Sequence, residues 1–84
     1  MLYMDKVKDN AQLVANTIWK YEGEDERAKI LNLCATHGLQ KLSSVNPAHE
    51  LNGVHIIDEN TIREVVVDEY TDVKYTHYQV NNLD

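Results

Sequence analysis

The sequence predicts a single α+β domain over residues 1–84, in which an antiparallel two-helix hairpin is followed by a three-stranded antiparallel β-meander, in a two-layer ααβββ arrangement. Two observations predict this fold class. Apolar residues recur at the three- and four-residue spacing of a helix over the first 38 positions, and β-branched and aromatic residues gather after position 53. A domain this small has little core to spare for a deep active site.

The first helix is expected over residues 5–22. Val14 and Ile18 belong to an apolar stripe on one helical face, whereas Leu13 lies opposite this stripe and Trp19 lies on its flank. Because neither Leu13 nor Trp19 has an obvious place in the core, both are predicted to be self-association residues. A homodimer is therefore expected as readily as a monomer.

The second helix is expected over residues 24–38. Glu24, Asp25 and Glu26 form an acidic first turn, which the positive end of a helix dipole favours. Gly38 suits the left-handed position that ends many helices. The short connection between the two predicted helices indicates that they are antiparallel neighbours.

The stretch after the second helix has two interpretations. Asn46 and Pro47 suit the start of a short helix over residues 47–51. In the alternative, Asn52 and Gly53 form the tight turn of a β-hairpin. The short helix is preferred, because a proline so close by weakens a strand.

Three strands are expected, over residues 54–57, 61–69 and 73–80. Alternation along the last two strands predicts one apolar face against the helices and one face that is acidic and rich in tyrosine. A shift of one residue in their pairing would exchange the two faces. The residues predicted to bind a partner on the acidic side are Glu59, Glu64, Asp68, Tyr70, Asp72 and Tyr75.

The net charge is −6, and residues 46–84 carry all of it, with eight acidic residues against two basic ones. This half of the chain repels phosphate groups and favours a basic protein surface as its partner. Direct nucleic-acid binding is not expected, because it depends on clustered Lys and Arg that are missing from the sequence. The carboxylates could instead stand in for phosphates, and a partner that normally handles nucleic acid would suit them.

Cys34 and His37 are three residues apart on the second predicted helix, so they could begin a metal site or act as a nucleophile and its base. The other histidines, His49, His55 and His77, show no paired zinc-ligand spacing. A thiol within an apolar helical stripe is poorly accessible and has a raised pKa. No catalytic residue, metal or cofactor is therefore predicted.

Glu64 and Asp68 share one face of a predicted strand and could form an acid/base pair. Four residues of a strand span about 13 Å, which is too far for the paired carboxylates of glycoside hydrolysis. A solvated acidic face is the preferred interpretation.

The single cysteine cannot form an internal disulfide, which favours a reducing environment. The first ten residues hold Asp and Lys where a signal peptide needs an apolar run, and no apolar stretch is long enough to span a membrane. We therefore expect a cytoplasmic protein without a membrane partner.

Together these features predict a non-enzymatic, acidic protein-binding module that inhibits or modulates a basic partner, as a mimic of nucleic acid. A small accessory protein of a phage or another mobile element fits this size and charge. The alternative is a structural or scaffolding subunit that forms a homo-oligomer through an apolar helix face.

Overall fold

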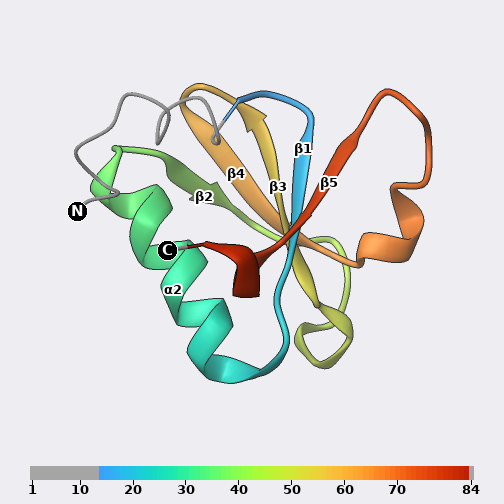
Figure 1. The fold of residues 1–84 in the computed structure, drawn as a ribbon, viewed down its shortest axis with the longest axis horizontal. Helices are drawn as coiled ribbons and strands as arrows, with labels where there is room; N and C mark the ends of the chain where they lie inside the picture. Colours follow the sequence, from blue (N-terminus) through green and yellow to red (C-terminus); the bar gives the residue numbers. More distant parts are fainter. Residues whose placement is uncertain (1–13, 84) are drawn as a thin grey trace.

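The computed structural model describes residues 14–83, which form a five-stranded mixed β-sheet with one α-helix (Figure 1). The regular elements are β1 (Thr17–Lys20), α2 (Gly23–Thr36), β2 (Gln40–Leu42), β3 (Gly53–Asp58), β4 (Thr61–Val65) and β5 (Thr76–Gln79), together with the short 3₁₀ helices η2 (Ala48–Glu50), η3 (Val67–Glu69) and η4 (Val80–Asn82). None of the helices in these residues is long and apolar enough to cross a membrane.

The strands lie in the order β2-β4-β3-β1-β5. β3 is antiparallel to both of its neighbours, whereas β5 is parallel to β1 and β2 is parallel to β4. The predicted helical hairpin with a three-stranded antiparallel meander is therefore wrong. Within residues 14–83 there is one α-helix, and of the meander only the first hairpin, β3 with β4, is present.

The helix predicted over residues 5–22 is wrong at its C-terminal end, where residues 17–20 form β1; residues 5–13 lie outside the described range. Asn16 has a φ of 68°, a left-handed conformation through which a right-handed helix does not continue. Ile18 and Trp19 are both buried, and because strand side chains alternate, they lie on opposite faces of the sheet. β1 is a central strand covered on both faces, so its apolar residues are consecutive.

The helix α2 corresponds to the one predicted over residues 24–38. Gly38 has a φ of 82°, and its N–H donates to the Ala35 carbonyl at 3.0 Å, while the Leu39 N–H donates to the Cys34 carbonyl at 3.0 Å. These two bonds are the Schellman arrangement that ends many helices. They turn the chain back toward the sheet, where Leu39 is buried and β2 begins.

The main core lies between α2 and one face of the sheet. It contains Trp19, Tyr21, Ile30, Cys34, Leu39, Val54, Ile56, Ile62, Val80 and Leu83. Trp19 is 3 % exposed and stacks on Tyr78, with 4.5 Å between the ring centroids. Trp19 is therefore not the exposed contact predicted for self-association, and the other residue of that prediction, Leu13, lies outside the described residues.

The second predicted hairpin, between residues 61–69 and 73–80, does not form. The chain leaves the sheet after β4 and returns as β5, which pairs with β1. The intervening stretch, which we call the 66–75 segment, packs Tyr70 and Tyr75 against His55, on the sheet face away from α2. In Figure 1 it is the orange stretch between β4 and β5. Val67, Tyr70 and Tyr75 of this segment pack on that face instead of forming a strand, whereas Val73 is 98 % exposed.

The short helix predicted over residues 47–51 corresponds to η2, which begins directly after Pro47. Gly53 is not in a hairpin turn, because it is the first residue of β3. Val67 of the 66–75 segment packs directly over Gly53, so a Cβ atom at position 53 would overlap Val67 Cγ2 and lie 3.0 Å from the Trp19 carbonyl oxygen.

We expect the substitution Gly53→Ala to destabilise the domain by about 1–3 kcal/mol, as overpacking of a filled core does. The β-branched Val67 side chain and the Trp19 backbone have little freedom to move aside. Urea denaturation would measure the loss. Val67→Ala removes the overlapping methyl group, so the double variant should lose less free energy of unfolding than the two single variants combined. Strict additivity would contradict this packing.

Candidate functional site

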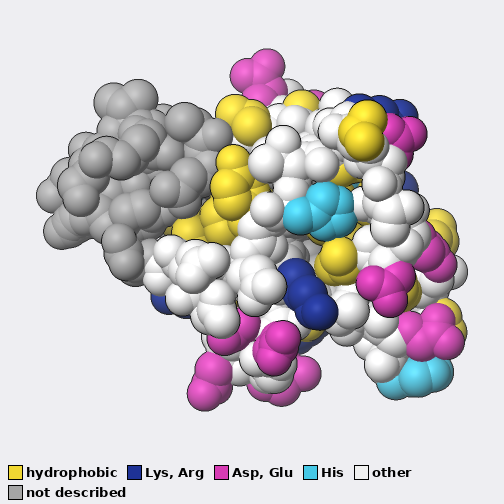
Figure 2. Space-filling model, turned by 45° about the vertical axis from the view of Figure 1, so that its right-hand side comes forward, with side chains coloured by type: hydrophobic (Ala, Val, Ile, Leu, Met, Phe, Trp, Pro, Cys, Tyr) yellow, Lys and Arg dark blue, Asp and Glu magenta, His cyan; other side chains and the backbone are white. Residues whose placement is uncertain are grey.

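The structure divides the residues that were predicted to form one acidic face. Glu59 is exposed in the turn between β3 and β4, whereas Asp68 and Asp72 are exposed on the 66–75 segment. Glu64 is only 3 % exposed and lies on the α2 side of the sheet. Figure 2 likewise shows acidic side chains in separate groups rather than in one continuous patch. The prediction that Glu64 is a surface contact for a partner is therefore wrong.

Glu64 instead connects β4 to three other stretches of the chain through its buried carboxylate. The Tyr21 hydroxyl, after β1, and Arg27 Nε, on α2, each donate to Oε1 at 2.8 Å. Arg27 Nη2 and Lys41 Nζ, the latter on β2, donate to Oε2 at 3.0 and 3.3 Å. The carboxylate of β4 is therefore satisfied on both oxygens by a bidentate arginine, a lysine and a phenol.

These contacts hold Glu64 in its ionised form. Burial by itself would raise the pKa of Glu64, but the hydrogen bonds from Arg27, Tyr21 and Lys41 outweigh it and lower that pKa to about 2. Burial and the bond to Glu64 raise the pKa of Tyr21 above its ordinary value. A carboxylate bound in this way is a poor proton acceptor. Asp68 lies on the 66–75 segment instead, so the acid/base pair with Glu64 is not assembled.

A second group of polar residues lies on the opposite face of the sheet, around His55. The ring of His55 has its centroid 5.0 Å from that of Tyr70 and 5.4 Å from that of Tyr75, and the two tyrosine rings are 5.2 Å apart. His77 Nε2 lies 2.5 Å from the Tyr70 carbonyl oxygen, and Lys74 Nζ is 5.2 Å from the Tyr75 ring centroid. Tyr70 and Tyr75 are therefore half-buried packing residues rather than freely exposed contacts.

The imidazole of His55 is buried, and its Nε2 atom has no hydrogen-bond partner among residues 14–83. Burial lowers the pKa of His55, and the neighbouring Arg63 lowers it further. Burial also raises the pKa of Tyr70. This face therefore holds a neutral histidine at pH 7, next to a fixed positive charge. No sequence pattern predicted this group of residues around His55, because its members lie on three separate stretches of the chain.

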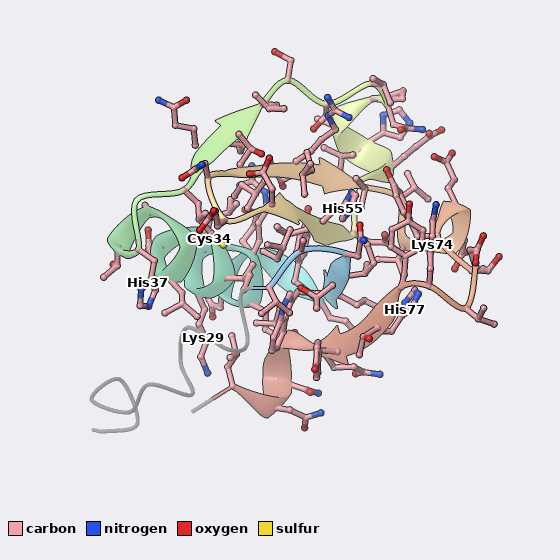
Figure 3. All side chains as sticks on the ribbon, turned by 90° about the horizontal axis from the view of Figure 1, so that it is seen from above. Lys29, Cys34, His37, His55, Lys74 and His77 are labelled. Atoms are coloured by element: carbon pink, nitrogen blue, oxygen red, sulfur yellow. The ribbon has the colours of Figure 1, made fainter. Side chains whose placement is uncertain are left out.

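Cys34 and His37 lie at the other end of the molecule from His55 and His77 (Figure 3). Cys34 is fully buried in the main core, and burial raises the pKa of its thiol to about 12. The nucleophile considered for Cys34 would therefore be protonated and inaccessible. Among residues 14–83, no three His, Cys, Asp or Glu residues are placed to share a metal ion.

Two groups of exposed acids follow β1 and β4, which finish at the same end of the sheet. One group precedes and begins α2, and the other lies on η3. Asn52 holds the two chain segments together, because its carbonyl oxygen accepts the Tyr21 N–H at 3.0 Å and its side-chain oxygen accepts the Val67 N–H at 2.8 Å. We call this region the acidic end, and its exposed members are Glu22, Glu24, Asp25, Asp68 and Glu69.

Of the five residues of the acidic end, sequence reasoning assigned only Asp68 to a partner surface. Asp68 was expected to be exposed, whereas the acids that begin α2 were interpreted as partners of the helix dipole alone. Comparisons with protein-family models, curated proteins and solved structures find no match to this chain. The case for any function therefore depends on the residues of this chain.

Proposed function

We propose that this protein is a non-enzymatic module that binds a basic surface of a partner protein through its acidic end and so inhibits or modulates that partner. The observation that carries the proposal is the exposure of five carboxylates on the two sides of Asn52. Of the five, Glu24 has a basic neighbour, Arg27, at 3.4 Å, and the shorter bonds of Arg27 go to Glu64. The acidic end thus keeps most of its negative charge for a partner.

Charge of one sign on a rigid frame suits recognition of an opposite surface. Exposed carboxylates accelerate encounter with a basic protein and make the affinity depend on salt. α2 and β4 fix the spacing of the two groups, so the carboxylates stand in for phosphates on a protein that normally grips nucleic acid. Cys34, as a lone buried thiol, is compatible with a reducing, cytoplasmic setting for this interaction. The scaffolding alternative loses support because Trp19 is buried.

Charge reversal tests the proposal directly. We expect Asp25→Lys and Asp68→Lys, one on each side of Asn52, to weaken capture of a basic partner by about tenfold when combined, because each removes a favourable charge and adds a repulsive one. Capture from extracts of the native host at 50 and 300 mM salt, with quantitative mass spectrometry, would measure this loss.

The matched control is Glu59→Lys, which reverses an exposed charge in the turn between β3 and β4. A partner of the acidic end should be retained by this variant and released by high salt. Binding that is equally strong at both salt concentrations and in the variants at positions 25 and 68 would refute the proposal.

A further inference from the structure

The sheet face away from α2 carries a row of residues that no part of the proposed function uses. Across the strands β4, β3, β1 and β5, the pairing places Arg63 beside His55, His55 beside Ile18, and Ile18 beside His77. The 66–75 segment lies over this row, with the rings of Tyr70 and Tyr75 on the His55 imidazole. Figure 3 shows His55, Lys74 and His77 together at this side of the molecule.

The surroundings of His55 suit only a neutral ring. Its Nε2 atom is buried without a partner in the part of the chain that the structure describes, on a residue that is 9 % exposed. The groups that face it are Arg63 from β4 and the two tyrosines from the 66–75 segment, with Lys74 and His77 next to those tyrosines. None of these residues is a carboxylate. Glu69, which also belongs to the segment, accepts a bond from Asn46 Nδ2 at 3.2 Å instead.

The 66–75 segment is joined to the rest of the domain by few bonds. The Val67 N–H donates to the Asn52 side chain at 2.8 Å, Asn46 Nδ2 donates to the Glu69 carboxylate, and His77 Nε2 contacts the Tyr70 carbonyl. Its other backbone bonds at η3, from Glu69 and Tyr70, stay within the segment. Packing on His55 and Gly53 therefore supplies much of its attachment, whereas the core on the α2 side is independent of it.

We propose that the 66–75 segment is a pH-sensitive cover, which detaches from the sheet when His55 is protonated while the core around α2 stays folded. A protonated imidazole in this place would be a largely buried cation whose Nε2–H has no acceptor among the described residues, beside the positive charge of Arg63. Lifting the segment lets the imidazolium reach water. The inference stands on the His55 surroundings alone and does not depend on the partner proposed for the acidic end.

The direction of the pH effect follows from linkage. His55 has a lowered pKa when covered and an ordinary pKa of about 6.5 when uncovered, so the uncovered form binds protons first as the pH falls. The stability of the covered state relative to the uncovered state is thus greatest above pH 6.5 and decreases below it. Between pH 7.5 and 5.5 the uncovered population should rise by up to about tenfold.

Amide hydrogen exchange, corrected for intrinsic rates, tests this with the Val67 N–H as reporter and the amides of α2 as reference. Protection of Val67 should fall by up to about tenfold between pH 7.5 and 5.5, while protection of α2 stays unchanged. His55→Phe, which keeps an aromatic ring, should abolish the fall, and His49→Gln, at a histidine whose side chain is 80 % exposed, should preserve it.

Unchanged protection of Val67 in the wild-type protein, or an equal fall in His55→Phe, would overturn the proposal. An equal fall in α2 would also overturn it, because protonation would then unfold the whole domain. NMR titration of the His55 ring in the wild-type protein is a test that needs no variant. A midpoint below 6.5 supports the cover, and a midpoint at or above 6.5 excludes it.

Discussion

Substitution of Glu64 by glutamine is expected to destabilise the domain by about 2–3 kcal/mol at neutral pH. Glutamine keeps the size of the side chain but removes the charge, and its NH₂ group would meet the donors of Arg27 and Lys41. Removal of one partner from a fully buried ion pair costs about 3–5 kcal/mol. Arg27 and Lys41 are 36 % and 49 % exposed, so water recovers part of this loss. Chemical denaturation at pH 7 would measure it.

Glu64 also makes the stability of the domain depend on pH in the acidic range. The pKa of Glu64 is about 2 in the folded protein against an ordinary value of 4.5, so its contribution to stability is present above about pH 4.5 and is lost as the pH falls toward 2. Glu64→Gln should lack this part of the acid dependence. Asp68→Asn, at an exposed carboxylate, is the control and should behave like the wild-type protein. Equal acid sensitivity of the wild-type protein and Glu64→Gln would contradict the role of Glu64.

Substitution of Trp19 by alanine is expected to cost about 3–5 kcal/mol, which is most of the stability of a domain this small. The indole is 3 % exposed in the central strand and stacks on Tyr78. Circular dichroism should therefore show loss of cooperative unfolding in Trp19→Ala. Tyr78→Ala removes the other ring of the stack, which is 39 % exposed, and should cost less.

Light scattering distinguishes a core role of Trp19 from an interface role. Were Trp19 a contact between two copies of the chain, Trp19→Ala would stay folded and only lower the molecular mass. A folded Trp19→Ala with an unchanged melting temperature would refute the core role.

The sequence predicted the elements whose start or end is marked by residues within them or directly beside them. The acidic first turn and Gly38 place α2, and two apolar runs around an Asp-Glu-Asn turn place β3 and β4. β1 was mistaken for helix because a central strand buries consecutive residues, here Thr17, Ile18 and Trp19, so the alternation of a half-buried strand is missing. Its parallel partner, β5, is far away in the sequence, and such a pairing has no turn to reveal it.

The candidate site was less predictable than the fold. Glu64 was assigned to the surface because carboxylates are rarely buried unless they are paired, and its partners come from three stretches that no motif connects. His55 could not be singled out either, because the residues that surround it also come from separate stretches of the chain. The exposure of Asp68 was predictable, but its place at the same end of the sheet as the acids of α2 depends on strand pairing that the sequence does not reveal.

The parallel pairing of β1 with β5 also has a consequence for how the chain folds. The two strands come from nearly opposite ends of the described residues, and among these residues β5 has β1 as its one sheet neighbour. Pairings between such distant segments raise the contact order and slow folding. During synthesis, β1 remains without one of its two neighbours until residues 76–79 have left the ribosome. Completion of the sheet therefore waits for β5, and a chain that lacks residues 76–79 presents the open edge of β1 to other strands.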